Sequence, residues 1–340
     1  MGSQPIIDTT LVHDGVPGLA LTGDRIRATV FPAAGGKIAD LVHVPSGFDL
    51  LWKNPRVPLR ATYPGASFDD VWSGGWDELF PTDPPCVVGD NAFHDHGDLW
   101  CGPWEWQVVA DDGDTATVHL RRDTMSLPCR FEKEITLRRD ALDLVVCHRL
   151  TNLGLQPVPY TWSIHVAHAI GPGSRFHLPA ARVGAASPMR SRFGDDVHEL
   201  AWPLHDGVDL AAALPAEEGR TEWFHTIDQR DGWCAVTHPA QGVGLALSYD
   251  PELFRSTWTW GVYGGWRGHY VLLTEPSTSP PGGLAQAVAE GTAALLAPGE
   301  VLETTVVATV LEGVAPLGRG DELPDGADAH RYPPRRAPIG

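Results

Sequence analysis

The sequence predicts an all-β fold, a large antiparallel β-sandwich with few short helices. Strand-like runs with a period of two dominate the chain, and clusters of Gly, Pro, Asp and Asn separate them at short intervals. The composition agrees, because 43% hydrophobic and 20% charged residues are typical of a globular chain with a sizeable core. Helical patterns are scarce, and the best two span residues 284–290 and 210–214.

The alternation of apolar and polar residues defines the individual elements. In 131–137 it places Phe131, Ile135 and Leu137 on one face and polar residues on the other, which is the pattern of a half-buried strand. Residues 142–150 carry apolar side chains on both faces, which predicts a central strand. The full set of expected strands covers 25–31, 37–44, 49–52, 104–110, 115–122, 131–137, 142–150, 160–169, 232–238, 244–249, 258–262, 270–274 and 304–311.

We expect one catalytic domain over residues 1–312 and a C-terminal tail, rich in Pro, Gly and Arg, over 313–340. Residues 54–95 form a different kind of segment. They are long, poor in regular alternation and dense in aromatic and acidic residues. Loops of that length inside a compact domain are usually functional, so we expect the ligand site beside it.

Charge and cysteine content exclude several classes of protein. With 25 Lys and Arg against 43 Asp and Glu, the net charge is −18, so neither nucleic acid nor an anionic membrane is an expected partner. No apolar run approaches the roughly 18 residues of a membrane span, and residues 1–10 lack a signal-peptide pattern, which predicts a cytoplasmic location. The five cysteines contain no C-x-x-C pair, so we expect neither disulfides nor a zinc ribbon.

Common catalytic motifs are missing from the sequence. It contains no phosphate-binding P-loop, no G-x-G-x-x-G and no G-x-S-x-G, which excludes the usual kinase, dinucleotide oxidoreductase and serine hydrolase patterns. His94 and His96 form an H-x-H pair that could hold a metal ion if both lay on one strand. Trp100 and Cys101 occupy the positions where a carboxylate ligand would complete that pattern, so we assign no metal.

Four segments, in this order, resemble the aldose 1-epimerase family of the galactose-mutarotase-like superfamily. They are FPAAGGKI at 31–38 followed by LLW at 50–52; GGWDELFP at 74–81 followed by DHGDLW at 95–100 and Trp104; 152–165, ending in YTWSIH; and YVLLTEP at 270–276 followed by LAPGE at 296–300. The resemblance spans about residues 20–312. It implies the fold of that superfamily and an enzyme that interconverts the α and β anomers of a sugar.

Such a reaction opens the sugar ring by acid–base chemistry. One group removes the proton of the C1 hydroxyl while another protonates the ring oxygen, and a carboxylate facing an imidazole can do both near neutral pH. The resemblance implies that Glu275 is the general base, that His165 is the general acid, and that His96 binds the ring or stabilises developing charge. It implies no cofactor.

The substrate contacts are less directly implied. Indole faces pack on the C–H faces of sugars and carboxylates bind their hydroxyls, so we expect Trp76, Asp77 and Glu78 to contact a small, neutral carbohydrate. The alternative is that this segment packs over its own apolar side chains and contacts no substrate. No Arg occurs between Ala61 and Trp100 to match the arginine of galactose-type relatives, and Arg267 is our candidate replacement, with Arg60 as the other.

Two other functions remain open from the sequence. One is a lyase, isomerase or glycoside-processing enzyme on the same fold, using Asp77 or Glu78 with Glu275, and with a metal at His94 and His96 in one version. The other is a non-catalytic carbohydrate-binding protein, which would still bind sugar after loss of Glu275 and would exchange the anomers of none.

Overall fold

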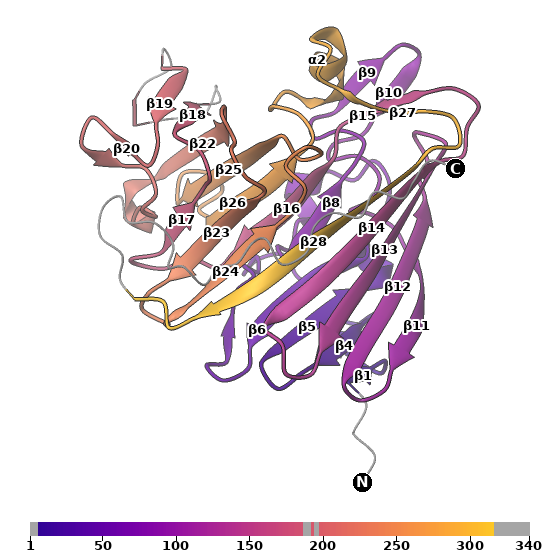
Figure 1. Cartoon of the computed structure of the whole chain (residues 1–340), viewed down its shortest axis with the longest axis horizontal. Coiled ribbons are helices and arrows are strands. Elements are labelled where there is room, and N and C mark those ends of the chain that lie inside the picture. Colours follow the sequence, from indigo (N-terminus) through magenta and orange to yellow (C-terminus); the bar gives the residue numbers. More distant parts are fainter. Residues whose placement is uncertain (1–5, 186–191, 194–196, 316–340) are drawn as a thin grey trace.

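A computed structural model of the chain describes residues 6–185, 192–193 and 197–315. Two large antiparallel sheets pack face to face (Figure 1), which confirms the predicted β-sandwich. The larger sheet contains, in spatial order, β1 (Ile7–Asp8), β4 (Leu19–Thr22), β5 (Ile26–Phe31), β6 (Lys37–His43), β8 (Trp76–Leu79), β16 (Ser163–His168), β26 (Tyr270–Ser277), β25 (Ser256–Tyr263), β22 (Arg220–Thr226), β18 (Arg182–Ala185) and β19 (Glu199–Ala201), and β7 (Phe48–Asp49) pairs with β6.

Within the described part of the chain, the second sheet has eight strands. In spatial order they are β11 (Glu105–Asp111), β12 (Thr115–Asp123), β13 (Cys129–Arg138), β14 (Asp143–Asn152), β28 (Val301–Glu312), β24 (Val243–Ser248), β23 (Trp233–His238) and β17 (Arg175–His177). The predicted central strand 142–150 is β14, which lies between β13 and β28. Only one of its faces is buried, because Cys147 and Arg149 on the other face are exposed.

Smaller elements lie outside the two sheets. In the described residues, four two-stranded ladders pair β2 (Val12–His13) with β3 (Val16–Pro17), β9 (Cys86–Val88) with β10 (Asn91–Phe93), β15 (Val158–Tyr160) with β27 (Ala294–Leu296), and β20 (Leu204–His205) with β21 (Val208–Asp209). The helical elements are α1 (Phe68–Val71), α2 (Gly283–Ala289) and the 3₁₀ turns Pro32–Ala34 and Ala216–Glu218. Figure 1 shows α2 beside β9 and β15 at one end of the molecule.

The helix expected over 210–214 is wrong. Backbone hydrogen bonds instead join this segment to β17, from Phe176 N to Ala211 O and from Ala213 N to Ser174 O. Pro215 follows immediately and disfavours helical geometry in the residue before it. Of the expected C-terminal tail, residues 316–340 lie outside the described part of the chain.

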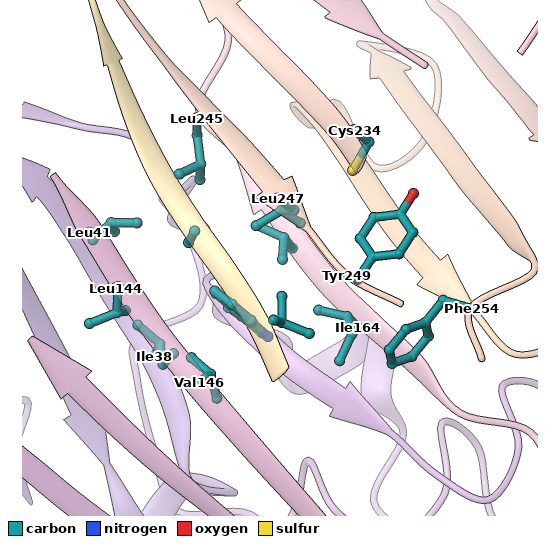
Figure 2. Close-up of a cluster of buried hydrophobic side chains, with 14 of the residues drawn as sticks. Ile38, Leu41, Leu144, Val146, Ile164, Cys234, Leu245, Leu247, Tyr249 and Phe254 are labelled. Carbon is teal, nitrogen blue, oxygen red and sulfur yellow. The ribbon is translucent and has the colours of Figure 1, made fainter. Parts of the chain in front are cut away.

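The main core lies between the two sheets. Figure 2 shows side chains from both sheets pointing toward one another, with Ile38 and Ile164 from the larger sheet and Leu144, Val146 and Leu247 from the smaller one. All five are fully buried. The alternation in the sequence produces this arrangement, because successive residues of a strand point to opposite faces of the sheet.

The larger sheet is also covered on its other side, which we call the outer face. A second apolar cluster lies there, and it combines sheet residues with residues of the long segment that follows β7. Its buried members are Trp52, Ala66, Phe68, Trp72, Trp100, Cys101, Ala167, Val262, Val271 and Leu273. The central strands β16, β25 and β26 are therefore buried on both faces, and polar residues placed on the outer face lie under a cover.

Substitution of Leu144 by Ala tests the position of the core. We expect a loss of about 2–5 kcal/mol in the free energy of unfolding, because a fully buried leucine loses its contacts and leaves a cavity. Cys147→Ala, on the exposed face of the same strand, is the control and should change stability by less than about 0.5 kcal/mol. Chemical denaturation measures both, and equal effects would contradict the assignment of faces.

Candidate functional site

A row of residues crosses the centre of the outer face. Strand register pairs Asp77 on β8 with His165 on β16, and the β16–β26 ladder, which pairs Val166 with Thr274, brings His165 opposite Glu275. Glu275 in turn pairs with Trp258 on β25. Directly opposed residues of neighbouring antiparallel strands share a face, so Asp77, His165 and Glu275 are successive neighbours.

A tight turn brings His96 to the same place. His96 has a left-handed backbone with φ 59°, and its N–H donates to Asp83 O at 2.6 Å. Gly97 follows with φ 69°, and a Cβ on Gly97 would lie 2.0 Å from Phe80 O. The H-G pair of the sequence is thus a turn that only glycine allows at its second position, and it points the His96 ring back toward the sheet.

These residues line one pocket of about 160 Å³. Its polar groups come from His96, His165 and Glu275, which the sequence predicted, together with Asp69 and Asp83. Its walls are aromatic, from Phe68, Trp72, Trp223, Trp260 and Trp266. No lysine or arginine is among the lining residues, so the pocket offers carboxylates, imidazoles and flat apolar surfaces.

Glu275 and His165 differ in their protonation. Burial raises the pKa of Glu275 to about 8, Asp83 adds to the effect, and the nearby His96 partly opposes it. Burial also lowers the pKa of His165 well below its ordinary value, and His96 and Lys37 act in the same direction. In the free protein at neutral pH, therefore, Glu275 holds a proton and His165 is uncharged.

His96 is the cation of the pocket. Burial alone would lower its pKa, but Asp83 and Asp95 outweigh it and raise the pKa to about 9. The Nδ1 atom of His96 lies 2.8 Å from Asp95 Oδ1, and its Nε2 atom lies 3.4 Å from Asp83 Oδ1. Phe68 stacks on the ring at 3.8 Å between centroids, and the same Phe68 ring meets His165 edge-on at 5.6 Å. Phe68 thereby fixes the relative placement of the two imidazoles.

Arg267 lies at the rim of this pocket. Its guanidinium donates to Asp69 O at 2.6 Å and to Asp70 Oδ1 at 2.9 Å, and it stacks over Trp266. It ties α1 to the loop between β25 and β26, both of which contribute walls. Arg267 therefore links two walls of the pocket. Its direct contact with a ligand stays a prediction.

The structure places Trp76 and Glu78 in the interior rather than in the pocket. Both point between the sheets, where Glu78 binds His148 Nε2 and Trp162 Nε1 at 3.0 Å each. Lys133 lies 3.8 Å from the same carboxylate. A sugar cannot reach side chains that are at most 1% exposed, so the expectation that Trp76 and Glu78 contact substrate needs this correction.

Asp77 faces the outer side but is also covered. It is 1% exposed and forms an ion pair with Lys37, which also donates to Gly74 O. Asp77 does not line the pocket. The expectation that it contacts a sugar hydroxyl is therefore corrected, because Asp77 lies beside His165 instead.

The two histidines of the H-x-H pair have different surroundings. Across the described ranges, no group of three or more His, Cys, Asp and Glu side chains has the geometry of a metal site. The ring of His94 lies against Gly65, and that of His96 is engaged by two carboxylates.

Several pocket residues were not singled out by the sequence. Phe68 and Asp83 lie within 54–95, the segment expected to be functional, but its pattern did not distinguish them from their neighbours. Trp223 and Trp260 come from strands far along the chain and meet only because β22 pairs with β25. The only sequence signal for Trp223 and Trp260 was the large number of tryptophans, 13 in all, and this number does not show which of them lie in the pocket.

Comparison with known proteins agrees with this architecture. Residues 15–310 match the model of a family described as Domain of unknown function (DUF4432). The chain belongs to this family. It matches no curated protein.

Solved structures share the fold. The Slr1438 protein of Synechocystis is 18% identical with a TM-score of 0.65, covering 90% of this chain and 99% of that one. A galactose mutarotase-like protein of Clostridium acetobutylicum is 14% identical, with a TM-score of 0.62 and coverage of 90% and 98%. A galactose mutarotase related enzyme of Lactobacillus acidophilus is 13% identical, with a TM-score of 0.60 and coverage of 88% and 99%.

The chain thus has the β-sandwich fold of the galactose mutarotase-like proteins. Identities this low establish a shared fold and not a shared reaction. Of the helices in the described ranges, none has the length and apolar character to cross a membrane.

The titration of Glu275 gives a prediction for stability. A protonated Glu275 favours the folded state below its ordinary pKa of 4.5, and this contribution is lost as the pH rises through about 8. Glu275→Gln cannot titrate, so its melting temperature should rise relative to that of the natural protein between pH 5 and pH 8.5. Calorimetry across this range measures the difference. Glu217→Gln, at an exposed position, should show no such trend, and a constant difference for Glu275→Gln would contradict the assignment.

Proposed function

We propose that the protein is an aldose 1-epimerase that interconverts the α and β anomers of a sugar by opening and closing its ring. The observation that supports this most strongly is the placement of Glu275 and His165 on adjacent strands, facing one aromatic-walled pocket. Ring opening needs one proton acceptor and one proton donor on the two sides of the C1–O5 bond, and this pair can supply both.

The proposed reaction is a balanced exchange of protons. Glu275, as carboxylate, takes the proton of the C1 hydroxyl while His165, as imidazolium, gives a proton to the ring oxygen. The C1–O5 bond breaks and the open-chain aldehyde forms. Rotation about C1–C2 presents the other face of the aldehyde, the C5 hydroxyl adds to it, and the two protons return. His96, as a cation, stabilises the negative charge of Glu275 and of the oxygen it deprotonates.

The lining favours a neutral sugar as substrate. Trp223, Trp260 and Trp266 offer flat surfaces for the C–H faces of a ring, and Asp69 and Asp83 offer acceptors for hydroxyls. A phosphate or carboxylate group would meet these acids without a lysine or arginine in the lining to pair with it. We therefore propose a neutral aldose as the substrate. A cytoplasmic location is also part of the proposal.

Removal of either proton-transfer group should abolish most of the activity. We expect Glu275→Gln and His165→Asn each to lower the rate of anomer exchange by about 10²–10⁴-fold, the usual contribution of a positioned acid or base. Polarimetry and exchange NMR on freshly dissolved neutral aldoses measure this rate, with Glu217→Gln as a control that should keep it. If the natural protein binds a sugar but exchanges the anomers of none, the proposal fails and a non-catalytic carbohydrate-binding protein is favoured.

The pH dependence tests the single proton that the pair shares. The proposed exchange needs one proton on Glu275 and His165 together, and kcat/KM reports the free enzyme, in which Glu275 loses that proton at a pKa of about 8. We therefore expect kcat/KM to be level near neutral pH and to fall as the pH rises through about 8, whichever member of the pair holds the proton at the moment of transfer. A value of kcat/KM that rises through pH 8 would contradict an acid–base pair with one shared proton.

A further inference from the structure

Lys37 and Asp77 form an ion pair that the proposed reaction leaves unexplained. Lys37 is 6% exposed and Asp77 is 1% exposed, so both charges are removed from water. A buried ion pair contributes little net stability, because the cost of desolvation offsets most of the attraction. Its position suggests a different use.

The strand register puts the pair at one end of the row that contains the site. Lys37 binds Asp77 from β6, Asp77 pairs with His165 on the next strand, and His165 is followed by Glu275. Directly opposed residues have Cβ atoms about 4.5–5.5 Å apart. Asp77 therefore lies beside His165 on one side, while Glu275 lies beside it on the other, pocket side.

Both facing side chains have an unused polar atom. Lys37 engages Asp77 Oδ2, whereas Asp77 Oδ1 is buried and has no hydrogen-bond partner within the described residues. His165 Nδ1 is likewise buried and unpartnered. A carboxylate oxygen and an imidazole nitrogen are complementary once the ring carries a proton at that nitrogen.

We propose that Asp77, held in place by Lys37, is a positioning residue that orients the His165 ring and stabilises its protonated form during turnover. The inference rests on the proposed function for its role in catalysis, but the contact itself does not. His165 must carry a proton in order to protonate the ring oxygen, and its surroundings oppose this.

The charged groups that face His165 come from several elements. Lys37 on β6 and His96 in the turn before Gly97 both disfavour a positive His165, while Glu275 on β26 is protonated in the free protein. The short helix α1 and the residue that follows it face His165 with the rings of Phe68 and Trp72. While Glu275 takes the proton of the C1 hydroxyl, Asp77 is thus the carboxylate placed to balance the positive charge of a protonated His165. Lys37 in turn opposes the rise in the pKa of Asp77 that burial causes.

The test begins with a readout that needs no substrate. Nitrogen NMR of the His165 ring in the full-length protein reports which ring nitrogen carries the proton, with His165→Asn used to assign the signals. We expect Asp77→Asn to change the tautomer ratio of His165. Asp40→Asn removes another partly buried, lysine-paired aspartate further along β6 and is the matched control, which should leave the ring signals unchanged. Identical His165 signals in Asp77→Asn and the natural protein would overturn the proposal.

Kinetics then separate positioning from stability. Asp77→Asn should lower kcat for anomer exchange about 10–100-fold with little change in KM, as loss of a partner that orients a histidine commonly does. A double variant, Lys37→Met with Asp77→Leu, replaces the pair by apolar groups and should keep the fold, since such replacements are often neutral. This double variant should lose kcat to the same extent, while its free energy of unfolding stays close to that of the natural protein. Full kcat in the double variant would overturn the proposal.

The two proposals fail in different ways. An altered His165 ring in Asp77→Asn, in a protein that exchanges the anomers of no sugar, would support the Asp77–His165 contact and contradict the epimerase function. Normal exchange with an unaltered ring in Asp77→Asn would support the epimerase function and contradict the positioning role of Asp77.

Discussion

The register of five antiparallel strands is the constraint on which the candidate site depends. Because β6, β8, β16, β26 and β25 pair without an intervening strand, residues distant in sequence become neighbours in one row across the outer face. The row places Lys37, Asp77, His165, Glu275 and Trp258 in that order. A shift of one residue in any of these pairings would send a site residue into the core, since the side-chain period of a strand is two.

Burial on both faces of the larger sheet gives that row its chemistry. Several other buried carboxylates of this protein are ion-paired. Glu78 is paired with His148 and Lys133 between the sheets, Glu222 with Arg192, and Asp77 with Lys37. Glu275 differs, because among the described residues no ion pair or hydrogen bond engages its carboxylate, although it is only 6% exposed. A buried carboxylate kept without a direct partner is costly, and this is the arrangement that active sites use to tune an acid or base.

The sequence predicted the architecture well because alternation and turn residues are local signals. Phe131, Ile135 and Leu137 are buried as their spacing required, and the segments carrying His96, His165 and Glu275 do meet in one pocket. The pattern could not orient Trp76, Asp77, Glu78 and Leu79, because all four are buried and no alternation marks their faces. Nor could it bring Trp223 and Trp260 to Asp83, because those contacts depend on strand order and on the path of a loop.

The electrostatics of the pocket form a sequence of dependent steps. Asp83 and Asp95 keep His96 charged against the effect of burial, and Asp83 also raises the pKa of Glu275. The charge of His96 then acts in two directions, favouring a carboxylate at Glu275 and opposing a proton on His165. Left to themselves, these groups keep the proton of the pair on Glu275. In the proposed reaction, Glu275 as base needs that proton on His165 instead, and a negative charge on the side of His165 that faces away from Glu275 and the ligand would stabilise it there. Asp77 occupies that side, and Lys37 fixes it there before any substrate arrives.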